Sequence, residues 1–167
     1  MSHIWLIGMM GSGKSSVGRE LALRRAQPFY DTDAAVEAAV GMTIAEIFGS
    51  EGEGRFRSLE SEAVHQIASQ PEGIVATGGG VVLDGASVET MRSSGVTVLL
   101  EADSTALISR VAQGDDRPLI AGDPEARIGE IAADRAERYA AAADVIVDAD
   151  GSIAQVADRV EQACAAS

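Results

Sequence analysis

The chain is poor in cysteine and in long apolar runs. Its 167 residues include one cysteine, Cys164, which excludes an internal disulfide. This residue continues an apolar stripe at helical spacing, so we interpret it as a packing side chain. No uninterrupted apolar stretch reaches the length of about eighteen residues that a membrane-spanning helix needs. The first apolar run is too short for a signal peptide and lacks a basic leader. We therefore expect a soluble, cytoplasmic protein.

Basic residues are also scarce. Asp and Glu total 26 against 13 Lys and Arg, which gives a formal net charge of −13 at pH 7. Such a surface repels nucleic acids and anionic membranes over most of its area, so we expect neither as a partner. Because salt screens exposed charges beyond about 8 Å, a local cluster of arginines in a cleft can still capture an anionic small molecule.

Only one lysine occurs, and it completes a phosphate-binding motif. Residues 8–15 read Gly-Met-Met-Gly-Ser-Gly-Lys-Ser, a full match to the pattern G-x-x-x-x-G-K-[ST]. The preceding run, residues 3–7, is typical of a buried strand, and a helix should begin at the far end of the loop. Lys14 should then reach the β- and γ-phosphates, and the Ser15 hydroxyl should ligate Mg²⁺. The alternative is a glycine-rich turn without a ligand. The motif predicts a phosphate cradle formed by Gly11, Ser12, Gly13, Lys14, Ser15 and Ser16.

Short apolar runs recur along the chain, with helical patterns between them. They occupy residues 4–7, 28–30, 73–76, 96–100 and 145–147. Most are continuous in apolar character, which is typical of parallel strands covered by helices on both faces. A length of 167 residues with 46% hydrophobic residues fits one compact domain, residues 1–167. We therefore predict an α/β fold whose ligands bind beyond the carboxyl ends of the strands.

Two carboxylates follow the second predicted strand, where the chain leaves the sheet. Asp31 ends this strand, and Asp33 lies two residues further on. Since Mg²⁺ keeps several waters and prefers one or two carboxylates plus phosphates, Asp31 is placed to hold a water of its shell. Asp33 is placed to orient or deprotonate an acceptor hydroxyl. The alternative is that either aspartate only caps the helix expected over residues 34–40.

A longer helix should begin near residue 52, after a short helical piece over residues 43–48. Its apolar stripe leaves Arg57 and Glu60, three residues apart, on a neighbouring face that can border the cleft. Arg57 would suit a carboxylate ligand through its bidentate fork, with Glu60 fixing its orientation. Spacing alone, however, favours an ordinary surface ion pair.

Three consecutive glycines, Gly78, Gly79 and Gly80, come directly after the third predicted strand. Glycines in this place are costly unless the backbone must approach something closely. A bound ligand is the first candidate for that neighbour. A tight turn is the alternative.

The segment 115–124 is largely polar, contains two prolines and a glycine, and separates two helical patterns. We interpret it as part of a lid, over approximately residues 112–124, that closes over ATP and brings Arg117 against the transferring phosphoryl group. An ordinary exposed loop is the alternative. Arg135 follows on a helix, where solvent exposure is the default, and is a second candidate for binding an anionic substrate.

In combination these features resemble the shikimate kinases, small members of the nucleoside-monophosphate-kinase-like group of P-loop proteins. A P-loop alone is generic, whereas Asp-Thr-Asp, Phe-Arg and Gly-Gly-Gly in this order are specific. The resemblance covers almost the whole chain. It rests on residues 8–15, 31–33 and 44–48, Gly52-Glu53, Phe56-Arg57, Glu60, residues 78–80, Arg117-Pro118-Leu119, and Arg135 four residues before Tyr139.

The resemblance implies a three-layer α/β/α fold with a five-stranded parallel sheet, a lid and a substrate-binding helical region. It also implies ATP-dependent phosphorylation of the 3-hydroxyl of shikimate, a carboxylate that carries three hydroxyl groups. No partner-binding stripe stands out in the sequence, so we expect a monomer.

For the acceptor, the resemblance implies that Arg57 and Arg135 clamp the carboxylate. Asp33 would engage ring hydroxyls and help to activate the acceptor, and the backbone around Gly79 and Gly80 would line the pocket. These roles agree with the residue chemistry described above.

For the nucleotide, the resemblance implies that Lys14, Arg117 and an Mg²⁺ ion on Ser15 neutralise charge on the transferred group. By the same resemblance, Arg110 would flank the adenine.

Two other functions fit parts of the pattern. A different small-molecule kinase of this fold, such as a gluconate kinase, would keep the cradle and the lid but should not need two arginines for a ring carboxylate. A nucleotide-dependent binding module would bind ATP without acceptor-dependent release of ADP. Asp33 and Arg117 argue against that second alternative.

Overall fold

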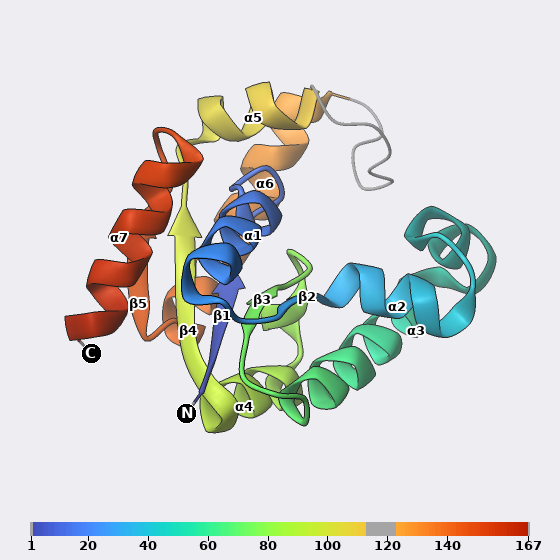
Figure 1. The fold of residues 1–167 in the computed structure, drawn as a ribbon. Coiled ribbons are helices and arrows are strands. Elements are labelled where there is room, and N and C mark those ends of the chain that lie inside the picture. The colour runs from blue at the N-terminus through green and yellow to red at the C-terminus, as the bar shows by residue number, and fades with distance from the viewer. Residues whose placement is uncertain (1, 113–122, 167) are drawn as a thin grey trace.

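A sheet of five parallel strands forms the centre of the computed structural model, which describes residues 2–112 and 123–166. The strand order is β2-β3-β1-β4-β5, and helices lie on both faces of the sheet (Figure 1). The predicted three-layer α/β/α fold is therefore confirmed. The strands are β1 (His3–Ile7), β2 (Phe29–Asp31), β3 (Ile74–Ala76), β4 (Gly95–Glu101) and β5 (Val145–Asp148), within one or two residues of the five predicted runs.

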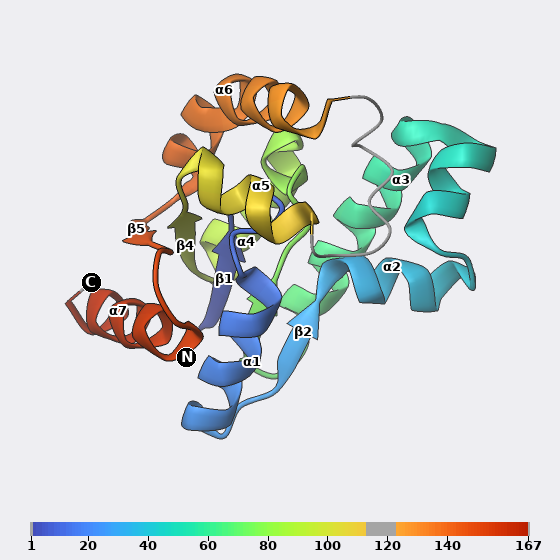
Figure 2. The same cartoon turned by 90° about the horizontal axis from the view of Figure 1, so that it is seen from above.

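Helices connect the strands, as parallel pairing requires. Viewed from above, α1 and α7 cover one face of the sheet, whereas α4 and α6 cover the other (Figure 2). The helices of the described residues are α1 (Lys14–Arg25), α2 (Thr32–Val40), α3 (Ile44–Ala68), α4 (Gly85–Ser94), α5 (Ser104–Ala112), α6 (Pro124–Ala142) and α7 (Ile153–Ala166), with a short 3₁₀ helix η1 (Val81–Leu83).

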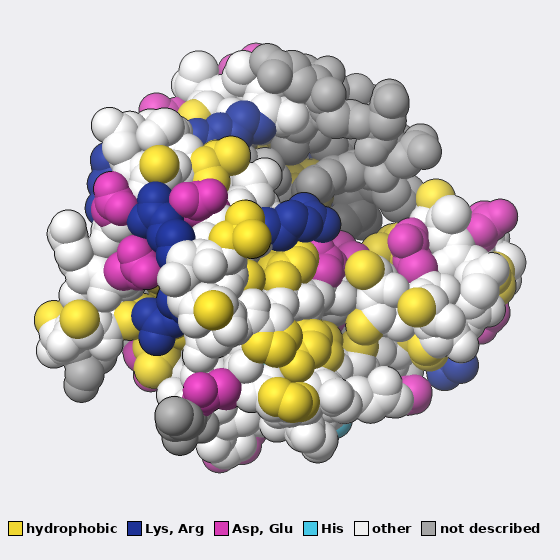
Figure 3. Space-filling model, in the orientation of Figure 1, with side chains coloured by type: hydrophobic (Ala, Val, Ile, Leu, Met, Phe, Trp, Pro, Cys, Tyr) yellow, Lys and Arg dark blue, Asp and Glu magenta, His cyan; other side chains and the backbone are white. Residues whose placement is uncertain are grey.

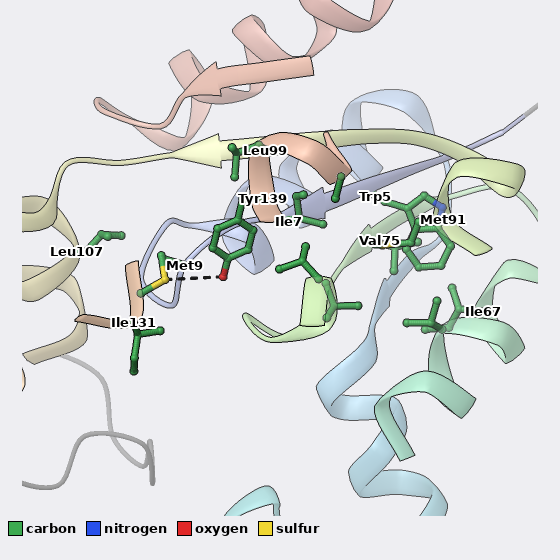
Figure 4. Packing of buried hydrophobic residues seen from close by; sticks show 14 of the residues in the cluster. Trp5, Ile7, Met9, Ile67, Val75, Met91, Leu99, Leu107, Ile131 and Tyr139 are labelled. Carbon is green, nitrogen blue, oxygen red and sulfur yellow. Dashed lines mark hydrogen bonds between the residues drawn. The ribbon is translucent and has the colours of Figure 1, made fainter. Parts of the chain in front are cut away.

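The central strand β1 sends side chains into both halves of the core. Trp5 and Ile7 pack in a cluster with residues of α3, α4 and α6 (Figure 4), whereas Ile4 and Leu6 pack against α1 and α7. Both faces of β1 are buried, which explains why its apolar run is continuous. The edge strand β5 differs, since Ile146 is 54% exposed.

Helices α2 and α3 project to one side of the sheet and bury an apolar cluster of their own (Figure 1). Helix α3 is interrupted at Gly52, which has φ 83° and ψ 172°. This break confirms the predicted short helical piece followed by a longer helix. The cluster consists of Val36, Ile47, Phe56, Leu59 and Ala63.

Charges of both signs lie interspersed over α1 and α7 on the face shown in Figure 3. Arg24 of α1 forms ion pairs with Glu20 on its own helix and with Asp158 and Glu161 on α7. Cys164 of α7 is half-buried against the apolar cluster that α7 shares with α1, and burial raises the pKa of its thiol, in agreement with a packing role. Within residues 2–112 and 123–166, no helix combines the length and hydrophobicity needed to cross a membrane.

Candidate functional site

The loop between β1 and α1 has the backbone shape of an anion cradle. Gly8 has φ 142°, and a Cβ atom there would lie 2.6 Å from the carbonyl oxygen of Leu100 in β4, so only glycine fits. No side chain caps the first turn of α1, which begins at Lys14. The amide groups at such a helix end attract an anion. Lys14 is 8% exposed, and its Nζ donates to the carbonyl oxygens of Gly8 at 2.8 Å and Met9 at 2.9 Å.

A polar cavity of about 370 Å³ borders this loop. The cavity brings together most residues that the sequence predicts for the nucleotide. Ser12 instead borders the neighbouring cavity of about 220 Å³, and its buried hydroxyl has no hydrogen-bond partner among the described residues. The larger cavity is lined by Gly11, Gly13, Lys14, Ser15, Ser16, Asp31, Asp33, Thr77, Gly79 and Arg110.

Asp31 combines a capping role with a place at this cavity. Its Oδ1 accepts from the backbone N–H groups of Asp33 at 3.0 Å and Ala34 at 3.3 Å, which caps α2. Its Oδ2 accepts from the Ser15 hydroxyl at 3.0 Å. A hydroxyl and a carboxylate thus meet beside the cradle, and such oxygen donors fit the preferences of Mg²⁺.

Arg110 on α5 lies against the back of the phosphate loop. Its Nη1 donates to the carbonyl oxygen of Gly11, and its Nη2 donates to that of Ala149 after β5, both at 3.2 Å. The side chain borders both cavities near the loop. Arg117 and most of the predicted lid, residues 113–122, lie outside the described residues.

A second pocket lies between the triple glycine, α3 and α6. Asp33 and Gly79 border this pocket and also the phosphate cavity, so the two spaces adjoin. The predicted acceptor residues are therefore brought together beside the predicted nucleotide residues. The lining comprises Met10, Asp33, Ile44, Phe48, Phe56, Arg57, Glu60, Gly78, Gly79, Gly80 and Arg135.

The Arg57–Glu60 pair is part of this pocket and is not an ordinary surface ion pair. Arg57 Nη1 donates to Glu60 Oε2 at 2.8 Å, and Glu60 is 2% exposed. Burial raises the pKa of Glu60, although the positive charges of Arg57 and Arg135 oppose this shift. Burial acts to lower the pKa of Arg57, but the carboxylates of Glu60 and Glu53 together outweigh it, and the pKa is raised. Arg57 therefore stays charged.

Burial of this pair leaves two of its polar atoms without partners in the part of the chain that the structure describes. Arg57 Nε and Glu60 Oε1 are buried and have no hydrogen-bond partner within the described part of the chain. Arg135 is only 8% exposed, contrary to the default for an arginine on a helix. The pocket thus presents two guanidinium groups, which suits an acceptor with a carboxylate.

The triple glycine makes room for side chains of the site itself. A Cβ atom on Gly78 would lie 2.2 Å from Glu60 Oε1, and one on Gly80 would lie 2.2 Å from Arg57 Nη1. The sequence predicted a close approach here, with a ligand as the first candidate. The structure shows that charged side chains of α3 occupy that space, because the pair packs directly against the loop.

Two hydroxyl groups that sequence reasoning did not select hold this loop in place. Gly78 N donates to Thr32 Oγ1 at 2.9 Å, and the Tyr139 hydroxyl donates to the Gly79 carbonyl oxygen. Both residues are buried. The sequence feature that could have identified these two residues is their position in the motifs, since Thr32 is the centre of Asp-Thr-Asp and Tyr139 lies one helical turn after Arg135.

Known proteins match this chain over almost its whole length. A shikimate kinase family model matches residues 10–165. The shikimate kinase of Caldanaerobacter subterraneus subsp. tengcongensis is 40% identical over 164 residues, which cover 98% of this chain and 96% of that protein. The shikimate kinase of Symbiobacterium thermophilum is 45% identical over 152 residues, which cover 89% of this chain and 87% of that protein.

A solved structure agrees with the sequence matches. The shikimate kinase from Acinetobacter baumannii in complex with shikimate superimposes with a TM-score of 0.95 at 29% sequence identity, covering 99% of this chain and 94% of that chain. The two chains therefore share one fold over almost their whole length. The chain belongs to the shikimate kinase family.

Proposed function

We propose that this protein transfers the γ-phosphoryl group of ATP to the 3-hydroxyl of shikimate, giving shikimate 3-phosphate and ADP. The observation that carries the proposal is the pair of adjoining pockets, one with a phosphate cradle and one with two arginines, which share Asp33 and Gly79. Membership of the shikimate kinase family supports it, as does the shikimate bound to the Acinetobacter baumannii relative.

On the nucleotide side, the triphosphate would lie against the backbone N–H groups of residues 11–16, with Lys14 as a point charge. Ser15 would ligate Mg²⁺ directly, and Asp31 would hold one of its waters. The ion would supply positive charge that neutralises the transferred group. Arg110 would flank the adenine, and Arg117 would add charge from the lid.

On the acceptor side, Arg57 and Arg135 would bind the carboxylate of shikimate, and the backbone of residues 78–80 would line the pocket. Asp33 borders both pockets and would accept the proton of the 3-hydroxyl as its oxygen bonds to phosphorus. Positioning and charge stabilisation supply most of what phosphoryl transfer requires.

We also propose that the chain works as a single domain, with a lid over approximately residues 112–124, as a cytoplasmic monomer without nucleic-acid or membrane partners. The net charge of −13 supports the exclusion of polyanionic partners. Sedimentation equilibrium tests the monomer, because a molecular mass above 17.2 kDa would contradict it.

The test of the proposed function is a coupled assay of ADP release with shikimate, gluconate and nucleoside monophosphates as acceptors. In the presence of ATP, we expect rapid ADP release with shikimate and not with the other two acceptors, and loss of that release when Mg²⁺ is chelated. The product should carry phosphate on carbon 3. Faster turnover with gluconate would favour a gluconate kinase. Nucleotide binding without acceptor-dependent release would favour a non-catalytic module.

A further inference from the structure

Tyr139 joins three parts of the site from a buried position on α6. Its side chain is 4% exposed, and its hydroxyl donates to the carbonyl oxygen of Gly79. The hydroxyl oxygen of Tyr139 also lies 3.7 Å from Met9 Sδ, toward which it points in Figure 4. A phenol has one O–H group to donate. We assign that hydrogen bond to the Gly79 carbonyl oxygen and interpret the Met9 sulfur as a packing contact.

Each residue that Tyr139 positions belongs to a ligand site or borders one. Met9 belongs to the phosphate loop, and its carbonyl oxygen accepts from Lys14 Nζ at 2.9 Å. Gly79 borders both the phosphate cavity and the acceptor pocket. Arg135 lies one helical turn before Tyr139 on the same face of α6. The contact of Tyr139 with the triple-glycine loop therefore also fixes the position of Arg135 relative to the pocket.

The surroundings keep the Tyr139 hydroxyl a donor. Burial raises its pKa, the negative charge of Glu60 acts in the same direction, and Arg135 and Arg57 oppose the shift only in part. The phenol therefore stays protonated at neutral pH and can hold the Gly79 carbonyl throughout turnover. No ligand needs to touch Tyr139 for this function.

We propose that Tyr139 is a positioning residue for phosphoryl transfer, which sets the phosphate cradle and the acceptor pocket at their working separation through Gly79, Met9 and Arg135. This inference rests on the proposed function. It predicts that loss of the hydroxyl impairs the use of shikimate and the transfer step, because a small displacement of two reacting groups slows their reaction steeply. Nucleotide binding alone uses only one side of this arrangement and should change little.

The chain offers a matched control, because it contains two tyrosines, each of which donates to a backbone carbonyl oxygen. Tyr30 donates to Pro71 at 3.0 Å, away from both pockets. We expect Tyr139→Phe to raise the KM for shikimate about two- to tenfold, the scale of one net hydrogen bond. We expect kcat to fall about tenfold. The KM for ATP should stay within twofold of wild type, and Tyr30→Phe should leave all three constants unchanged.

The outcomes separate the two proposals. An inactive wild-type enzyme, without shikimate-dependent ADP release, would overturn the proposed function. An active wild type with equal shikimate kinetics in Tyr139→Phe and Tyr30→Phe would overturn only the positioning role. A lowered thermal midpoint with wild-type KM and kcat would do the same, since it identifies a purely structural contact.

A second measurement covers the case in which Tyr139→Phe does not fold. In the Tyr30→Phe background, Tyr139 is the single tyrosine, and biosynthetic incorporation of a fluorotyrosine makes its phenol more acidic at almost the same size. We expect the KM for shikimate to rise on the alkaline side at a lower pH than in the unlabelled variant. Superimposable pH profiles of the two proteins would overturn the proposal.

Discussion

Arg57 Nη1 and Glu60 Oε2 form an ion pair at 2.8 Å in which the carboxylate is almost completely buried. The two residues lie three apart on α3, a spacing that usually produces an exposed pair worth a few tenths of a kcal/mol. Burial makes this pair energetically different from an exposed one. Loss of one partner leaves the other charge without compensation in the pocket, which is costly.

We expect Arg57→Ala to weaken the use of shikimate selectively. A charge-assisted hydrogen bond to a ligand carboxylate contributes about 1.5–3 kcal/mol, so the KM for shikimate should rise roughly 10- to 150-fold. The KM for ATP should change little. Arg55→Ala is the matched control, because Arg55 lies two residues earlier and pairs with Glu51 on the surface. An unchanged KM for shikimate in Arg57→Ala would remove this residue from the pocket.

Asp33→Asn should retain nucleotide binding and lose turnover. The amide cannot accept the proton of the acceptor hydroxyl, and a general base contributes about 10²- to 10⁴-fold to a rate. Steady-state kinetics would measure kcat, and calorimetry would measure the Kd for ATP. Asn at the exposed Asp134 serves as the control. A kcat near that of wild type would refute the role of Asp33 as the base.

Ser15→Ala should raise the Mg²⁺ concentration needed for half-maximal activity. The substitution removes the hydroxyl that donates to Asp31 at 3.0 Å and that would ligate the ion. Ser15→Thr keeps a hydroxyl at this position and should restore the Mg²⁺ dependence of wild type. Titrations of activity with Mg²⁺ would compare the three proteins, and identical curves would contradict the assignment.

Asp84 gives a stability prediction with a defined pH dependence. It caps α4, and hydrogen bonds from Ser87 and Ser61 lower the pKa of its carboxyl below the usual 3.8. A lowered folded-state pKa contributes stability above the unfolded value, and this contribution is lost as the pH falls through the folded pKa. We expect Asp84→Asn to destabilise the protein by about 0.3–1 kcal/mol at pH 7, because asparagine can still cap the helix but lacks the negative charge that the helix N-terminus attracts.

Urea unfolding of both proteins as a function of pH would check this prediction. The difference in the free energy of unfolding between wild type and Asp84→Asn should be constant near neutral pH and should shrink below pH 3.8. A difference that stays the same down to the most acidic conditions would show that charge on Asp84 is not its source.

The fold was largely predictable because the relevant patterns are local. Five apolar runs and the glycine-rich motif at residues 8–15 are visible within short windows of sequence, and the structure contains a strand or loop at each. Gly52 likewise marked the break in α3. The outward side chain of Ile146 was not predictable, because an edge strand reads like a central one in a short apolar run.

The site was predictable in its charged residues and not in the contacts that hold them. Arg57 and Asp33 carry chemistry that can be read from residue type and spacing. The partners of Thr32 and Tyr139 lie 46 and 60 residues away along the chain, and no short-range pattern reports such a distance. Arg135 was a candidate for the anionic substrate although solvent exposure is the default for an arginine on a helix. Its burial follows from packing of α6 over the triple glycine, which spacing alone does not show.

The separate apolar cluster of α2 and α3 has a consequence for protein engineering. The segment that carries Arg57 and Glu60 lies between β2 and β3, and its outer part packs on itself through Phe56 and Leu59, whereas Val64 and Ile67 of α3 pack in the core beside the sheet. One contiguous stretch, which begins after Asp33, thus supplies Arg57, Glu60 and the apolar wall of the acceptor pocket, whereas Arg135 and the triple glycine are supplied from elsewhere in the chain. Chimeras that graft another residue 34–68 segment onto this scaffold, with Asp33 kept, should be able to change the phosphorylated molecule while leaving the triphosphate cradle intact.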